Sequence, residues 1–257
     1  FYYRLFYYFF FVSMFDTHCH LDSYLHSPSD FSTTPDFNYL AVSTKPSNWL
    51  PLIAFCKTIP NVYCALGIHP WFVQELTNDS VQLLEHCIKQ NSVSAIGEIG
   101  LDFLPEYKVT KSIQLQVFES QLSLAQKYNK PVSLHIVKAH NQALGLLHEH
   151  SVNGVVHGLG ASKQLVQQYL DLGLKIGING VSVKTGARRY HELIKYCGVH
   201  NLVLETDFPN IILPNHLAAS LSDLNVVAEH AAGLLNISFD EFIRCTDVNA
   251  KQLFIES

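Results

Sequence analysis

Short apolar segments alternate with helical patterns along nearly the whole chain of 257 residues. This alternation is typical of repeated strand–helix units, in which parallel strands form a sheet that helices cover. The expected strands are residues 12–17, 39–43, 62–67, 94–99, 131–136, 153–157, 173–178 and 201–206. Eight strands are the number that closes such a sheet into a barrel, and the chain length suits eight units.

The segments between these strands carry the periodicity of amphipathic helices. Val81, Leu84 and Ile88 share one helical face, and Ser238 with Glu241 three residues later has the form of a capping box that opens a helix. No linker rich in Pro, Gly or Ser and no repeat divides the chain after Met14. We therefore expect an α/β fold with a single domain.

The first thirteen residues, FYYRLFYYFFFVS, precede the only methionine, Met14. They lack the basic start and small-residue cleavage site of a signal peptide, and their apolar run is shorter than the roughly 20 residues that span a bilayer. We expect residues 1–13 to be a non-native extension or, if they are translated, a tether to a membrane surface. Residues 14–257 are expected to form the barrel, which has no predicted membrane contact.

Composition narrows the class of protein. Hydrophobic residues make up 48% of the chain and charged residues 15%, which excludes a disordered protein. The net charge of -5 provides no overall basic field, although a local basic groove stays possible. The six cysteines form no CxxC pair, and this pattern favours reduced thiols in a cytoplasmic protein over a disulfide framework.

Histidines and carboxylates occur at the ends of the predicted strands, where βα barrels assemble their sites. His18 and His20 are two residues apart and should face the same side. The others are His69, Glu98, His135, His157 and Asp207. Each alone is more often structural, but their recurrence indicates one polar site. Imidazoles with carboxylates suit zinc, manganese, nickel or iron better than calcium, and a bridging carboxylate suits a pair of ions that activate water for hydrolysis.

Six motifs, in this order and at these intervals, resemble the TatD family of metal-dependent deoxyribonucleases: DTHCHLD, GIHP, GEIGLD, LHI, VVHG and LETDFP. The resemblance extends over the chain from Met14 onward. It implies a TIM barrel, two divalent metal ions (zinc, magnesium or manganese) and DNA as the substrate. One implied ligand set is His18, His20, Glu98 and Asp207, and the other is Glu98, His135 and His157.

The resemblance also implies a role for individual residues. Glu98 would bridge the two ions, and Asp207 would bind metal and orient or deprotonate the attacking water, so these two are the expected catalytic residues. His69, at the family's GxHP position, is an expected substrate contact, and Lys138 is expected to contact phosphate in place of an arginine that the family usually has beside it. The implied activity is hydrolysis of DNA phosphodiester bonds, of the exonuclease type, and no stable protein partner is expected.

Several residues around the expected site depart from the family pattern. Val137 stands where an arginine is usual, Leu159 and Gly160 replace an aromatic residue and a serine, and Phe208 replaces a small residue. Two alternatives therefore stay open: hydrolysis of an ester, amide or lactone, and a barrel that has lost catalysis and binds a partner. Glu98 favours the deoxyribonuclease, because related barrels with those other activities generally bridge their metals through a modified lysine.

Two further features have more than one interpretation. Lys184, Arg188 and Arg189 form a small basic cluster after the seventh strand, where they would either contact phosphate or simply begin a solvated helix. Trp71, which follows His69 and Pro70, would either stack on a base or anchor a buried loop.

Overall fold

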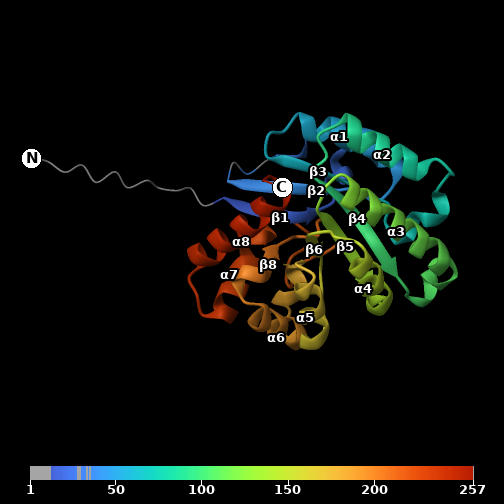
Figure 1. The fold of residues 1–257 in the computed structure, drawn as a ribbon. Coiled ribbons are helices and arrows are strands. Elements are labelled where there is room, and N and C mark those ends of the chain that lie inside the picture. Colours follow the sequence, from blue (N-terminus) through green and yellow to red (C-terminus); the bar gives the residue numbers. More distant parts are fainter. Residues whose placement is uncertain (1–12, 28–29, 33, 35, 257) are drawn as a thin grey trace, which may run out of the picture.

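The computed structural model describes residues 13–27, 30–32, 34 and 36–256. Its eight parallel strands form one closed barrel in chain order, with β8 paired to β1 (Figure 1). The predicted TIM barrel with a single domain is confirmed. The strands are β1 (Met14–Cys19), β2 (Phe37–Val42), β3 (Val62–Leu66), β4 (Ala95–Asp102), β5 (Val132–Val137), β6 (Gly154–Val156), β7 (Lys175–Ile178) and β8 (Leu202–Leu204). Of the predicted extension, only Ser13 lies within the described residues.

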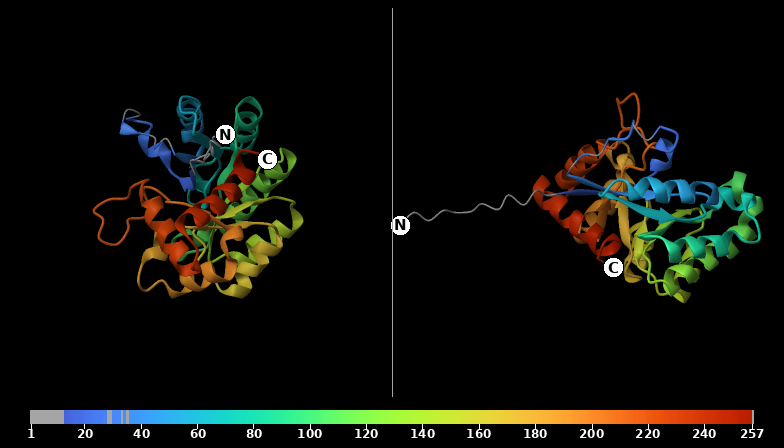
Figure 2. Two further views of the ribbon diagram at one scale, coloured as in Figure 1. Left: turned by 90° about the vertical axis from the view of Figure 1, so that its left-hand side faces the viewer. Right: turned by 90° about the horizontal axis from the view of Figure 1, so that it is seen from above.

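Helices follow the strands and surround the barrel (Figures 1 and 2). The α-helices are α1 (Pro46–Lys57), α2 (Ser80–Gln90), α3 (Lys111–Lys127), α4 (His140–Glu149), α5 (Lys163–Asp171), α6 (Arg188–Cys197), α7 (Asp223–Leu235) and α8 (Phe239–Phe254). Shorter 3-10 segments are η1 (Leu21–Tyr24), η3 (Pro70–Glu75), η4 (Pro105–Thr110), η5 (Gly180–Val183) and η6 (Val199–Asn201). The expected cap of α8 is present, because Ser238 Oγ accepts the Glu241 N–H at 3.2 Å. No helix in the described part of the chain is long and apolar enough to span a membrane.

Alternate strand residues pack into two apolar clusters. In β2, Tyr39 and Ala41 belong to the larger cluster beneath the helices, whereas Leu40 and Val42 belong to a smaller cluster shared by several strands and the end of α8. The rings of Phe15, near the start of β1, and Phe254 are 6.0 Å apart. The amino end of the barrel is thus filled by apolar side chains, and the polar residues gather at the carboxyl end.

The strand bounds differ from those expected by a few residues, and two of these differences change the place of a site residue. Glu98, which was expected to end its strand, lies in the middle of β4, which continues to Asp102. His18, which was expected to follow its strand, lies within β1. The pairing of β4 with β5 shifts register between Ile96 and Ile99, and β1 shifts in the same way around His18. Such bulges redirect side chains from the middle of a strand, which the alternation of apolar residues cannot reveal.

The loops after β1 and β8 lie side by side on one side of the barrel (Figure 2). The His20 N–H donates to the Phe208 carbonyl oxygen at 2.7 Å. The Tyr24 ring stacks on the Phe208 ring, with centroids 5.6 Å apart and an interplanar angle of 7°. Phe208, one of the departures from the family pattern, is therefore matched by an aromatic partner in the neighbouring loop.

Candidate metal centre

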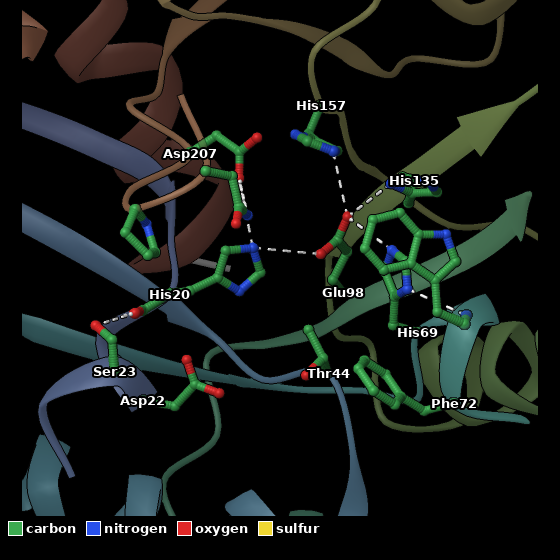
Figure 3. A pocket seen from close by; sticks show the side chains of 13 residues that line it. His20, Asp22, Ser23, Thr44, His69, Phe72, Glu98, His135, His157 and Asp207 are labelled. Atoms are coloured by element: carbon green, nitrogen blue, oxygen red, sulfur yellow. Dashed lines mark hydrogen bonds and ion pairs between the residues drawn. The ribbon is translucent and has the colours of Figure 1, made fainter. Parts of the chain in front are cut away.

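A cavity of about 500 Å³ opens at the carboxyl end of the barrel (Figure 3). Six of the expected site residues line it: His20, His69, Glu98, His135, His157 and Asp207. His18 is fully buried beneath them, and Lys138 does not line this cavity. The remaining lining residues are Asp22, Ser23, Thr44, Trp71, Phe72, Pro209 and Asn210. The structure thus brings together seven of the eight residues that the sequence singled out.

The carboxylate of Glu98 lies at the centre of the cluster, and each of its oxygens faces a different set of histidines (Figure 3). Glu98 Oε2 is 3.5 Å from His18 Nε2 and 3.6 Å from His20 Nε2. Glu98 Oε1 is 3.0 Å from His135 Nδ1 and 3.2 Å from His157 Nε2. This division corresponds to the two ligand sets implied by the family resemblance, with Glu98 between them.

Asp207 completes the set on the Oε2 side. Its Oδ1 lies 3.4 Å from His20 Nε2, and its backbone has a positive φ of 53° just beyond β8. The Asp207 N–H donates to the His18 carbonyl oxygen at 2.9 Å, which ties the residue to β1. Asp207 therefore takes its position from the junction of β8 with β1.

Three of the histidines are oriented by polar groups on the side away from Glu98. A histidine that binds a metal through one nitrogen usually offers its other N–H to such an acceptor, which leaves a lone pair toward the metal. Two of these contacts are hydrogen bonds, of His18 Nδ1 with Ser133 Oγ at 2.9 Å and of His135 Nε2 with Asp102 Oδ2 at 3.3 Å. The third is an ion-pair contact of His157 Nδ1 with Glu205 Oε1 at 3.4 Å. Each ring can therefore present an unprotonated nitrogen to a cation.

His69 is oriented in the opposite sense. Its Nδ1 accepts the Trp71 N–H at 3.2 Å, so the proton of the neutral ring resides on Nε2. Nε2 points at Glu98 Oε1, 3.5 Å away. His69 is thus arranged as a hydrogen-bond donor to the cavity, which agrees with the expected role in substrate contact.

The cluster fits divalent cations. His18 Nε2 is buried and, among the described residues, has no hydrogen-bond partner, as expected for a nitrogen that binds a metal. Two groups of side chains offer ligand atoms within 4.8 Å of one another: His18, Glu98 and His157; and His18, His20 and Asp207. A third close group is His69, Glu98 and His135, in which the inward nitrogen of His69 carries a proton. Neutral imidazoles with ionised carboxylates form a donor set for zinc, manganese or similar ions.

The carboxylates are held in the ionised form that a metal requires. Burial raises the pKa of Glu98, but its electrostatic interactions with the surrounding histidines (His69, His18 and His157) and its hydrogen bond with His135 more than offset burial and hold that pKa well below the ordinary value. Burial also opposes ionisation of Asp207, yet the hydrogen bond from His20 and the nearby histidines lower its pKa to about 2. Both groups are therefore anionic at neutral pH.

The pKa values of the histidines shift in different directions, depending on their surroundings. Burial lowers the pKa of every ring in the cluster, and it dominates at His18 and at His69, whose pKa falls to about 4. At His157 the carboxylates of Glu205 and Glu98 outweigh burial and raise the pKa well above its ordinary value. Carboxylates raise the pKa of His20 and of His135 in the same way.

Several supporting residues were missed by the sequence reasoning. Asp102 accepts hydrogen bonds from Trp71 Nε1 at 2.7 Å and from His135, and Glu205 accepts from the Gly158 N–H at 2.7 Å. Asp16 accepts from Thr206 Oγ1 at 2.6 Å and so joins β1 to the segment before Asp207. The available signal was a lone carboxylate within an otherwise apolar segment, as in FDT, GLD and VLET.

Trp71 is anchored by contacts to its neighbours and is also exposed at the cavity. Its indole N–H anchors it to Asp102, and its ring stacks on Tyr107 with centroids 5.3 Å apart. Nevertheless 47% of the side chain is exposed at the cavity.

Residues 15–255 match the family model described as TatD related DNase. The chain belongs to this family. It is 32% identical to a metal-dependent hydrolase of Haemophilus influenzae, over 78% of this chain and 82% of that protein. It is 30% identical to the metal-dependent hydrolase YjjV of Escherichia coli, over 77% of this chain and 80% of YjjV. The expected family is thus confirmed, and the chain is a metal-dependent hydrolase.

Solved structures agree with this assignment. The crystal structure of Escherichia coli YjjV, described as a TatD homologue, matches with a TM-score of 0.86 at 26% identity, over 95% of this chain and 98% of that one. A zebrafish (Danio rerio) relative named "Putative deoxyribonuclease tatdn3" is 28% identical over 93% of this chain and 96% of its own length.

Proposed function

We propose that this TatD-family hydrolase is a deoxyribonuclease that cleaves phosphodiester bonds with two divalent cations. The observation that carries the proposal is the position of Glu98, whose two oxygens face separate sets of histidines at 3.0–3.6 Å. A carboxylate placed in this way can bridge two cations. One set comprises His18, His20, Glu98 and Asp207, and the other comprises Glu98, His135 and His157.

A pair of divalent ions, when bound, supplies Lewis-acid polarisation of a phosphoryl oxygen and lowers the pKa of water. The chain contributes the orientation of each ligand. Ser133, Asp102 and Glu205 fix the rings of the histidines, and the register shifts in β1 and β4 direct His18 and Glu98 to the centre. Ser133 and Asp102 lie on strands and Glu205 directly follows β8, so the barrel itself holds the supports of the site.

Asp207 and His69 are placed to act on the substrate side of the cavity. A carboxylate with a pKa of about 2 does not retain a proton at neutral pH, so we assign Asp207 the orientation of the attacking water. His69 Nε2 carries a proton and can donate it in a hydrogen bond to a phosphate oxygen. The half-exposed Trp71 offers a ring face to a base.

DNA is supported as the substrate class by two similarities. The family model is described as TatD related DNase, and the zebrafish relative carries a deoxyribonuclease name. The setting of the cysteines is compatible with a cytoplasmic enzyme, since all six are free and five are buried. Cytoplasmic location forms part of the proposal.

The test is a cleavage assay on the full chain loaded with manganese, zinc or magnesium. End-labelled single-stranded DNA, bis(4-nitrophenyl) phosphate and a panel of esters, lactones and amides are assayed side by side, with Asp207→Asn as the inactive control. We expect metal-dependent shortening of the DNA that the control lacks. Turnover confined to esters, lactones or amides would refute the nuclease, and metal binding without any turnover would indicate a barrel that has lost catalysis.

A further inference from the structure

Five exposed cations lie on the loops and helix starts that follow β5, β6 and β7: Lys138, Lys163, Lys184, Arg188 and Arg189. Among the described residues, none of them forms an ion pair with a carboxylate. The lysines that do so are Lys89, Lys127 and Lys251, on other parts of the surface. The chain as a whole has a net charge of -5, so this unpaired positive charge is concentrated on one part of the surface.

These cations border three adjoining cavities of about 460, 490 and 410 Å³. Arg189 lines all three, so the cavities adjoin one another around its side chain. The residues that line them include a single carboxylate, that of Glu192, in the first. The hollowed surface is therefore complementary in charge to an anion.

The middle basic cavity is lined by residues that closely follow two of the expected metal ligands in the sequence. His157 lines the metal cavity, and the next residue, Gly158, lines the middle basic cavity. In the same way His135 lines the metal cavity, and Lys138 lines the middle one. A polymer that is bound at the metal centre and leaves over the ends of β5 and β6 would therefore pass these cations.

The arrangement is too extended for one phosphate group. Neighbouring strands are about 4.8 Å apart, so the loops after β5, β6 and β7 are spread over roughly 10 Å at the barrel itself. Exposed lysines and arginines without a fixed acceptor suit repeated contacts with phosphates, which position a strand without reading its sequence.

We propose that Lys138, Lys163, Lys184, Arg188 and Arg189 form a basic track that binds the backbone of single-stranded DNA behind the nucleotide held at the metal centre. The proposal rests on the proposed function, because it supplies the path of the same substrate. Lys138, expected from the sequence to contact the substrate, takes that role at a distance from the metals.

The test measures binding and cleavage separately, on the metal-loaded full chain. Binding is followed by fluorescence anisotropy with a labelled phosphorothioate dodecamer, which keeps the backbone charge and resists cleavage, and with the corresponding trinucleotide. The track variant is Arg188→Glu/Arg189→Glu. The matched control is Lys195→Glu/Arg244→Glu, which changes the net charge equally at exposed sites away from the three cavities. Melting temperature and metal content establish that both variants are folded and loaded.

We expect the track variant to bind the dodecamer at least about tenfold more weakly, and the control to bind like the wild type. The slope of log affinity against log salt should fall by about 0.7 for each lost phosphate contact, or about 1.4 for both arginines. Wild-type protein that binds the trinucleotide as tightly as the dodecamer would overturn the track. So would equal losses in the two variants, or no loss in the track variant.

The outcome for the track is distinguishable from that for the nuclease. Dodecamer binding that depends on Arg188 and Arg189, in a protein that cleaves no DNA, would support the track and refute the proposed function. If the wild type and the track variant cleave DNA with the same KM, the proposed function is supported and the track is refuted.

Discussion

The ring of Tyr190 occupies the space that a side chain at residue 160 would need. A Cβ atom on Gly160 would lie 2.7 Å from Tyr190 Cζ, closer than real Cβ contacts. The Tyr190 hydroxyl donates to the Gly158 carbonyl oxygen at 3.2 Å. Two departures from the family pattern, Leu159 and Gly160, thus lie in a loop that Tyr190 packs against and holds next to His157.

This relationship predicts the effect of restoring the serine that the family usually has. Gly160→Ser should lower the free energy of unfolding by about 1–3 kcal/mol, because the new side chain overlaps the Tyr190 ring. The same substitution in a Tyr190→Ala background should cost far less, since the ring is gone. Urea unfolding of the four proteins in the double-mutant cycle measures the difference. Equal costs in both backgrounds would show that the contact does not restrict residue 160.

A second prediction separates the two kinds of histidine in the cavity. His135→Ala should remove one of the two proposed metal ions, because His135 Nδ1 is directed at Glu98 with Asp102 behind the ring. His69→Ala should keep both ions and instead raise KM for DNA, because its inward nitrogen carries a proton. Metal content per chain and steady-state kinetics test this together. Loss of metal from the His69 variant would show that His69 is a ligand.

Much of this architecture could be predicted from the sequence because of the parallel topology. In a closed parallel barrel all carboxyl strand ends meet, so residues as distant in sequence as His18 and Asp207 must converge once eight strands are recognised. The apolar alternation predicted those strands, and the motif order predicted the family. Neither depends on details of side-chain packing.

The remaining features depend on register and on local backbone geometry. Glu98 reaches the centre from the middle of β4 because of a register shift between Ile96 and Ile99, which no periodicity encodes. Lys138 has a positive φ of 55° and lines the neighbouring cavity instead of the metal cavity. The support of His135 by Asp102 likewise follows from strand pairing, not from spacing along the chain.

A third prediction concerns that support. Asp102 Oδ2 accepts from Trp71 and His135, and Oδ1 accepts the Leu104 N–H at 3.0 Å. In Asp102→Asn, either orientation of the amide places its NH₂ group against one of these donors, so His135 is oriented less firmly. Metal affinity should fall by about 10- to 100-fold, as measured by competition with a chelator.

The matched control is Glu106→Gln, an exposed carboxylate in the following η4 segment. Its metal affinity should equal that of the wild type. If Asp102→Asn also binds metal like the wild type, the carboxylate does not orient the ligand, and its contact with Trp71 is then its main role.

A fourth prediction follows from competition between protons and metal. His20, His135 and His157 have pKa values raised above the ordinary 6.5, so in the metal-free protein their protonated forms stabilise the fold fully below about pH 6.5. That stabilisation is lost as the pH rises through the raised pKa values. Metal must displace the same protons, so its own stabilising effect grows with pH.

The melting temperature difference between metal-loaded and metal-free protein should therefore increase from about pH 6 to about pH 9. Asp207 does not contribute to this trend, since its pKa of about 2 keeps it ionised throughout the range. Differential scanning fluorimetry at fixed metal concentration measures the difference, and His148→Gln, an exposed histidine of α4, should leave it unchanged. A melting-temperature difference that is constant with pH would mean that metal does not displace protons from the three histidines with raised pKa values. These histidines would then not be metal ligands.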